Sequence, residues 1–115
     1  MHIKSNEMTT QVREHMRGGE GAAVLKIVAE GANLPKNCRF SALISLEPGS
    51  SIGYHVHEKE TEIFYFITGA GIVDDNGVKG EVAPGDCVIT PSGTGHSVQC
   101  TGQETLSFLA VIILD

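Results

Sequence analysis

Residues 49–69 read GSSIGYHVHEKETEIFYFITG, and two closely spaced histidines are the most informative feature of this stretch. His55 and His57 lie two residues apart between flanks that are typical of a β-strand. Side chains alternate between the two faces of a strand, so both imidazoles must point the same way. The apolar run that opens at Glu62 predicts a returning strand after a short loop at 58–61. This arrangement places a carboxylate beside two imidazoles.

The rest of the chain has the pattern of an all-β sandwich or barrel. Short β-branched and aromatic runs recur about every ten residues, with Gly, Pro, Asn or Asp between them. Turn residues at 47–49, 75–77 and 83–86 support these divisions and by themselves indicate a meander. We expect strands at 23–29, 38–46, 52–57, 61–67, 71–74, 78–82, 86–90, 95–100 and 105–113.

The length of 115 residues indicates one domain, and a composition of 41% hydrophobic and 19% charged residues is typical of a globular protein. We divide the chain into an N-terminal arm, residues 1–21, and a single β-barrel domain, residues 22–115. The arm is polar and ends in a glycine-rich stretch. We expect it to be irregular, with room for one short strand, and we assign it no function.

Charge and cysteine content restrict the partners and the compartment. The net charge of −6 and the absence of any Lys/Arg cluster along the sequence argue against nucleic acid and against an anionic membrane surface. No apolar run reaches membrane-spanning length and none forms a signal-peptide core, so we expect a cytoplasmic protein. Cys38, Cys87 and Cys100 are widely spaced and odd in number, which predicts reduced thiols rather than a disulfide framework.

A third imidazole, His96, follows a flexible loop at 91–95 that can return the chain toward the first pair. Three imidazole nitrogens and one carboxylate oxygen suit a divalent first-row transition metal such as Mn, Fe, Co, Ni or Zn. Glu58 and Glu60 compete with Glu62 for the carboxylate role, although their loop positions are more simply explained as solvated charges.

Two segments together resemble the signature of a known family. Residues 49–69 resemble the first cupin motif, G-x5-H-x-H-x3,4-E-x6-G, at every fixed position. Residues 85–100 resemble the second motif, G-x5-P-x-G-x2-H-x3-N, except that Cys100 stands where the family has Asn. The resemblance implies an all-β double-stranded β-helix, which is a jelly-roll β-barrel of the small single-domain type.

The resemblance also implies a metal site inside the barrel. Its ligands would be His55, His57, Glu62 and His96, and the motif spacing selects Glu62 over the two loop glutamates. The family's Asn is not one of the four usual ligands, so the change to Cys100 leaves the site intact. It affects the pocket wall instead.

Strand parity extends the prediction to the neighbours of the ligands. Phe64 and Phe66 share the parity of Glu62, while Val98 and Cys100 share that of His96. We expect these four to line the pocket, with simple core packing as the alternative. Arg39 is the only arginine within a likely barrel strand, and its facing is open. We find no Arg or Lys cluster that could hold a carboxylate and no recognisable general acid or base.

Several strands are apolar on both faces. An antiparallel strand with one solvent-exposed face would instead alternate apolar and polar residues. The clearest cases are the alternate residues Ile63, Tyr65 and Ile67 and the last strand, residues 106–114. The arm or a second subunit must cover these outer faces, and we predict a homodimer.

An octahedral ion with four protein ligands keeps about two positions for water, substrate or dioxygen. The first functional hypothesis is therefore a metal-dependent enzyme, dioxygenase-like or isomerase-like, acting on a small polar molecule that chelates the ion. The alternative is a non-catalytic cupin module that binds a small ligand or a sugar. A third hypothesis is a structural metal in a protein whose role is association.

Overall fold

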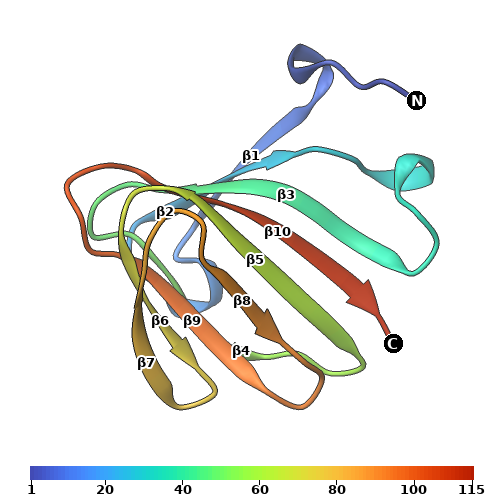
Figure 1. Ribbon diagram of the computed structural model, residues 1–115. Helices are drawn as coiled ribbons and strands as arrows, with labels where there is room; N and C mark the ends of the chain where they lie inside the picture. Colours follow the sequence, from blue (N-terminus) through green and yellow to red (C-terminus); the bar gives the residue numbers. More distant parts are fainter.

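The computed structural model describes residues 1–115 as a jelly-roll barrel built from two antiparallel sheets (Figure 1). The larger sheet has the strand order β1-β2-β3-β10-β5-β8 and the smaller one β4-β9-β6-β7. The strands are β1 (Thr9–Glu14), β2 (Ala22–Ile27), β3 (Cys38–Leu46), β4 (Ser51–Val56), β5 (Glu60–Thr68), β6 (Gly71–Asp75), β7 (Val78–Val82), β8 (Cys87–Thr90), β9 (Gly95–Cys100) and β10 (Leu106–Leu114). The only helices are the 3-10 turns η1 (Ser5–Glu7), η2 (Met16–Gly18) and η3 (Gly31–Asn33).

The nine expected strands all form, each within two residues of its expected bounds. Their connectivity differs from a meander, because only β1–β2, β2–β3 and β6–β7 are neighbours in both sequence and space. Strand β10 instead lies between β3 and β5, and β9 lies between β4 and β6. These long-range pairings close the barrel and bring the two motif segments together.

The hydrophobic core fills the space between the sheets. Alternate residues of β2, β3, β5 and β10 point inward and meet inward residues from β4, β6 and β9. Three phenylalanines share this layer, with ring centroids 4.7 Å apart for Phe64 and Phe108 and 5.1 Å for Phe66 and Phe108. The core therefore supports the strands that carry the histidines and Glu62.

The N-terminal arm joins the fold through two contacts. Strand β1 pairs with β2 over Thr9–Glu14, and η2 packs against β4. Glycines allow the second contact, because a Cβ on Gly53 would lie 2.1 Å from the carbonyl oxygen of Arg17 and one on Gly19 would lie 2.1 Å from that of Ser51. The backbone of the arm thus lies directly on the strand that bears His55.

The outer face of the larger sheet is apolar and partly exposed. Val12 on β1 is exposed on this face at one edge of the sheet, and the exposed apolar side chains of β5, β8 and β10 are Tyr65, Ile67, Ile89 and Ile113. The arm does not cover them, because β1 lies at one edge of this sheet while β5 and β8 lie at the other (Figure 1).

The structure contains no helix with the length and hydropathy needed to span a membrane.

Candidate metal centre

The structure brings the four predicted ligand side chains together at one end of the barrel. His55 on β4 stands opposite His96 on β9 in the antiparallel register, and Glu62 comes from β5 in the facing sheet. His57 follows the end of β4, where its amide donates to the carbonyl of Thr94. The candidate donor atoms all lie within 4.8 Å of one another. We call His55, His57, Glu62 and His96 the four-donor site.

Hydrogen bonds fix the orientation of each imidazole by its Nδ1 atom. His55 Nδ1 lies 2.8 Å from the carbonyl oxygen of Gly53, and His57 Nδ1 lies 2.6 Å from Glu60 Oε2. Thr90 Oγ1 lies 2.7 Å from His96 Nδ1. A carbonyl and a carboxylate only accept hydrogen bonds, so Nδ1 of His55 and His57 is the donor. Their Nε2 atoms consequently present lone pairs to the centre of the site.

The distances between donor atoms fit a single bound cation. His96 Nε2 lies 3.1 Å from His57 Nε2 and 3.2 Å from His55 Nε2, and Glu62 Oε1 lies 3.0 Å from Nε2 of both His57 and His96. Adjacent donors of an octahedral first-row ion, each about 2.1 Å from the metal, lie about 3.0 Å apart. Lone pairs this close repel one another unless a cation or a proton lies between them. The residues therefore fit a divalent metal.

Glu60 is buried rather than solvated, which corrects the expectation that it is a free charge in the loop. It opens β5 with 8% of its surface exposed and accepts from His57 on one side and Arg39 on the other. The two Arg39 bonds, from Nε and Nη2, are 2.7 and 2.8 Å long. The Arg39 guanidinium, assisted by His57, lowers the pKa of Glu60 to about 2. The residue stays an anion that holds the His57 ring.

The environment of His55 favours the form that binds metals. Burial lowers the pKa of His55 below its usual value of 6.5, and the neighbouring histidines and Arg17 lower it further, while the hydrogen bond to Gly53 acts in the opposite direction. A neutral imidazole is the metal-binding form. This environment favours the metal-binding form of His55 at neutral pH.

The four predicted pocket residues occupy different places. Phe64 lines the cavity beside the four-donor site and its ring stacks on His96, with centroids 4.7 Å apart. Phe66, Val98 and Cys100 are buried in the hydrophobic core and do not line this cavity. The Cys100 thiol donates to the carbonyl oxygen of Glu104 at 3.3 Å.

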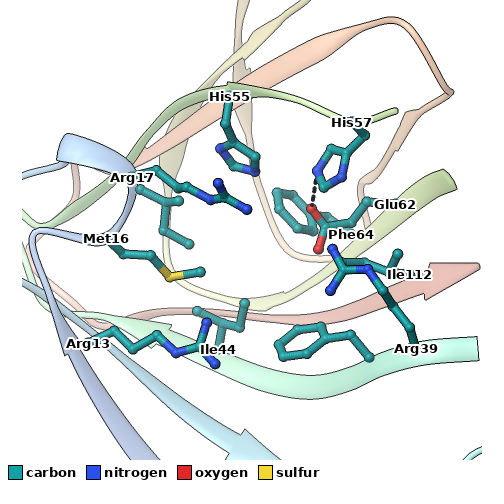
Figure 2. Close-up of a pocket in the computed structure, with 12 residues that line it drawn as sticks. Arg13, Met16, Arg17, Arg39, Ile44, His55, His57, Glu62, Phe64 and Ile112 are labelled. Carbon is teal, nitrogen blue, oxygen red and sulfur yellow. Dashed lines mark ion pairs between the residues drawn. The ribbon is translucent and has the colours of Figure 1, made fainter. Parts of the chain in front are cut away.

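A cavity opens from the four-donor site to the solvent. Apolar side chains form part of its wall, among them Met16, Phe40, Ile44, Ile52 and Ile112. His55, His57 and Glu62 line it together with arginines from both the arm and the barrel (Figure 2). The wall is therefore partly apolar and strongly basic.

The cavity arginines, Arg13, Arg17 and Arg39, correct the expectation that the chain has no Arg cluster. They lie on β1, η2 and β3, far apart in the sequence, and they are the only arginines in the chain. Figure 2 shows Arg13 and Arg17 on one side of the cavity and Arg39 on the other. No motif links these positions, because the pairing of β1 with β2 and the packing of η2 on β4 bring them together.

Comparisons with known proteins find one matching family model and several similar proteins. The family model described as "Cupin domain" matches residues 42–112. A curated protein of Thermotoga maritima named "Oxalate-binding protein" is 40% identical over 114 residues, covering 99% of this chain and 94% of that protein. A solved structure from Thermotoga maritima, described as a predicted oxalate decarboxylase, is also 40% identical, with a TM-score of 0.94 over the whole of both chains. A putative sugar phosphate isomerase of Acidithiobacillus ferrooxidans is 27% identical, with a TM-score of 0.79 over 97% of this chain and 74% of that one.

Proposed function

The chain belongs to the cupin family, and on that premise we propose that it binds a small anionic chelating molecule through one divalent first-row transition metal ion held by His55, His57, Glu62 and His96. The observation that carries this proposal is the position of the four-donor site at the inner end of a cavity lined by arginines. A bound metal would supply a Lewis-acidic centre with open positions for carboxylate oxygens.

The basic wall favours an anionic ligand over a neutral one. Guanidinium groups recognise carboxylates through paired, charge-assisted hydrogen bonds, whereas a neutral sugar gains less from them. The name of the Thermotoga maritima relative, "Oxalate-binding protein", agrees with this chemistry. Oxalate is therefore the first ligand to test.

We favour binding without turnover over isomerase-like or decarboxylase-like chemistry, because such reactions need a proton donor or acceptor beside the ligand. The ionisable side chains that line the cavity are the three arginines, His55, His57 and Glu62. An arginine keeps its proton at neutral pH, and the other three belong to the proposed ligand set. No lining side chain is left for the proton transfer.

The test is calorimetric titration of oxalate into protein loaded with Mn²⁺ or Co²⁺. We expect one metal ion per chain, oxalate binding that depends on the metal, and no release of formate or carbon dioxide. A His55→Ala/His57→Ala variant should retain no metal and bind no oxalate. Wild-type protein that carries no more metal than this variant would rule out the site, and formate production would replace the binding role with a decarboxylase.

We also propose that two copies of the chain pair through the outer apolar face of the larger sheet. The support is the partly exposed row of apolar side chains on β5, β8 and β10, which the arm leaves uncovered. A cytoplasmic location stays a prediction of the sequence.

A further inference from the structure

Resting on the proposed function, we propose that the arm arginines, Arg13 and Arg17, form an anion site opposite the four-donor site and select ligands with a second carboxylate. The ligand class that follows is a small dicarboxylate. Two of its oxygens would bind the metal, and its remaining oxygens would bind the arm arginines. The arm is then part of the binding site and determines its specificity.

The first support is the distribution of cations. The chain has three arginines and five lysines, and all three arginines line this one cavity while none of the lysines does. The chain as a whole carries a net charge of −6, so the basic wall runs against its overall charge. Arginine, unlike lysine, presents a planar fork of donors that matches a carboxylate.

The second support is that the two arm guanidiniums have no carboxylate partner. Arg39 is already paired with the Glu60 carboxylate through two hydrogen bonds. Arg13 instead donates only to the neutral amide oxygen of Gln11, at 3.0 Å, and Arg17 has no side-chain hydrogen bond or ion pair. Their charges are free to interact with a ligand.

The third support is the conformation of η2, which is strained and carries no fully buried residue, although Met16 packs against the core. His15 and Arg17 have φ values of 49° and 53°, in the left-handed region that costs a non-glycine residue about 1 kcal/mol or more. Hydrogen bonds hold the turn nevertheless, from His15 N to the carbonyl of Gly21 and from Ser51 N to that of Glu20. The strained backbone places the Arg17 side chain at the cavity, and Figure 2 shows its guanidinium beside His55.

The ligand chemistry follows from these positions. A dicarboxylate that chelates a metal through two oxygens keeps two further oxygens directed away from the metal. The arm arginines lie across the cavity from His57 and Glu62 (Figure 2). Their positive charges could therefore bind the two carboxylate oxygens that point away from the metal. A monocarboxylate chelator such as glycolate lacks this second carboxylate and would gain little from the arm.

The experiment compares oxalate with glycolate, because both can form five-membered chelate rings but only oxalate has a second carboxylate. Each ligand is titrated by calorimetry into Mn²⁺-loaded protein, as wild type and as R13Q, R17Q and the double variant. We expect each single change to weaken oxalate binding about 10-fold or more and glycolate binding by less than about 3-fold. Metal content and melting temperature should not change.

Two controls separate charge from geometry. Lys79→Gln on β7 removes one positive charge outside the cavity and should leave both affinities unchanged. Arg17→Lys keeps the charge but loses the fork, so it should recover only part of the oxalate affinity lost in R17Q.

The outcomes distinguish this inference from the proposed function. Unchanged oxalate affinity in the double variant, or an equal loss for oxalate and glycolate, overturns the role of the arm while the metal-dependent binding stands. Wild-type protein that holds the metal but binds neither ligand overturns the proposed function, and the inference with it.

Discussion

Glu60 stands behind the four-donor site, where its carboxylate joins Arg39 to His57. Such a partner fixes the tautomer and the orientation of a ligating imidazole and raises its basicity. The anion is secure at neutral pH because Arg39 lowers the pKa of Glu60 to about 2. A carboxylate that never touches the metal can therefore control how well the site binds it.

Glu60→Gln should weaken metal affinity about 10- to 100-fold while the protein stays folded, because His57 loses the anion that orients its ring. Competition with a fluorescent chelator measures the affinity. Glu58→Gln is the matched control, since Glu58 is an exposed glutamate two residues away. Equal metal affinity in the Glu60 and Glu58 variants would show that the Arg39–Glu60–His57 chain has no such role.

The convergence of the four-donor side chains could be predicted from the sequence, whereas the role of Glu60 could not. Strand parity places His55 and His57 on one face, and the motif spacing adds Glu62 and His96. Burial of a loop-edge glutamate depends instead on Arg39 reaching it from β3, a contact between residues 21 positions apart. Such a pairing depends on strand register and leaves no local pattern.

Among the secondary-structure elements, η2 contributes most to the site beyond the barrel itself. It packs on β4 where two glycine backbones meet, so its position is set by the missing side chains of Gly19 and Gly53. The carbonyl of Gly53 also accepts from His55 Nδ1. Gly53 thus both leaves room for the arm and orients His55, one of the proposed metal ligands.

Gly53→Ala should displace η2, because the new Cβ would lie 2.1 Å from the Arg17 carbonyl oxygen, a backbone atom that cannot yield alone. We expect a loss of about 1–3 kcal/mol in the free energy of unfolding, as for an overpacked site. Hydrogen exchange should quicken at the amides of Gly18 and Ser51, whose bonds hold the turn. Gly80→Ala on β7 is the control, because its Cβ would meet nothing within 4 Å. Protection in η2 that matches the control would contradict this packing.

The bounds of nine strands could be predicted because alternation and turn residues are local signals. The placement of the arm could not, since its polar sequence gives no sign that β1 pairs with β2 or that η2 reaches β4. Arg13 and Arg17 are for the same reason absent from the sequence-based site. Local sequence patterns predict where strands begin and end, whereas the pairing of one strand with another depends on tertiary packing.

At the scale of the whole molecule, the jelly-roll order separates strands that short turns join. The turns alone favour a meander, yet β10 pairs with both β3 and β5 across the barrel. Only the family motifs, whose two halves must meet at one metal, pointed to this closure. The same order places the row of exposed apolar side chains of β5, β8 and β10 on the outer face of the larger sheet, where Tyr65 lies between Cys87 and Leu109 in the cross-strand register.

Tyr65→Glu should convert a dimer to a monomer, because Tyr65 lies within this row, is 49% exposed, and would place two carboxylates in a self-complementary contact. Light scattering after size exclusion should give twice the chain mass of 12.2 kDa for the wild type and 12.2 kDa for the variant. Val78→Glu is the control, since Val78 is also exposed but lies on β7 in the other sheet. A wild-type mass of 12.2 kDa would refute the pairing, and a dimer that persists in the Tyr65 variant would move the interface off this face. Metal content should be the same in all three proteins, because the row lies on the outer face and the four-donor site lies inside the barrel.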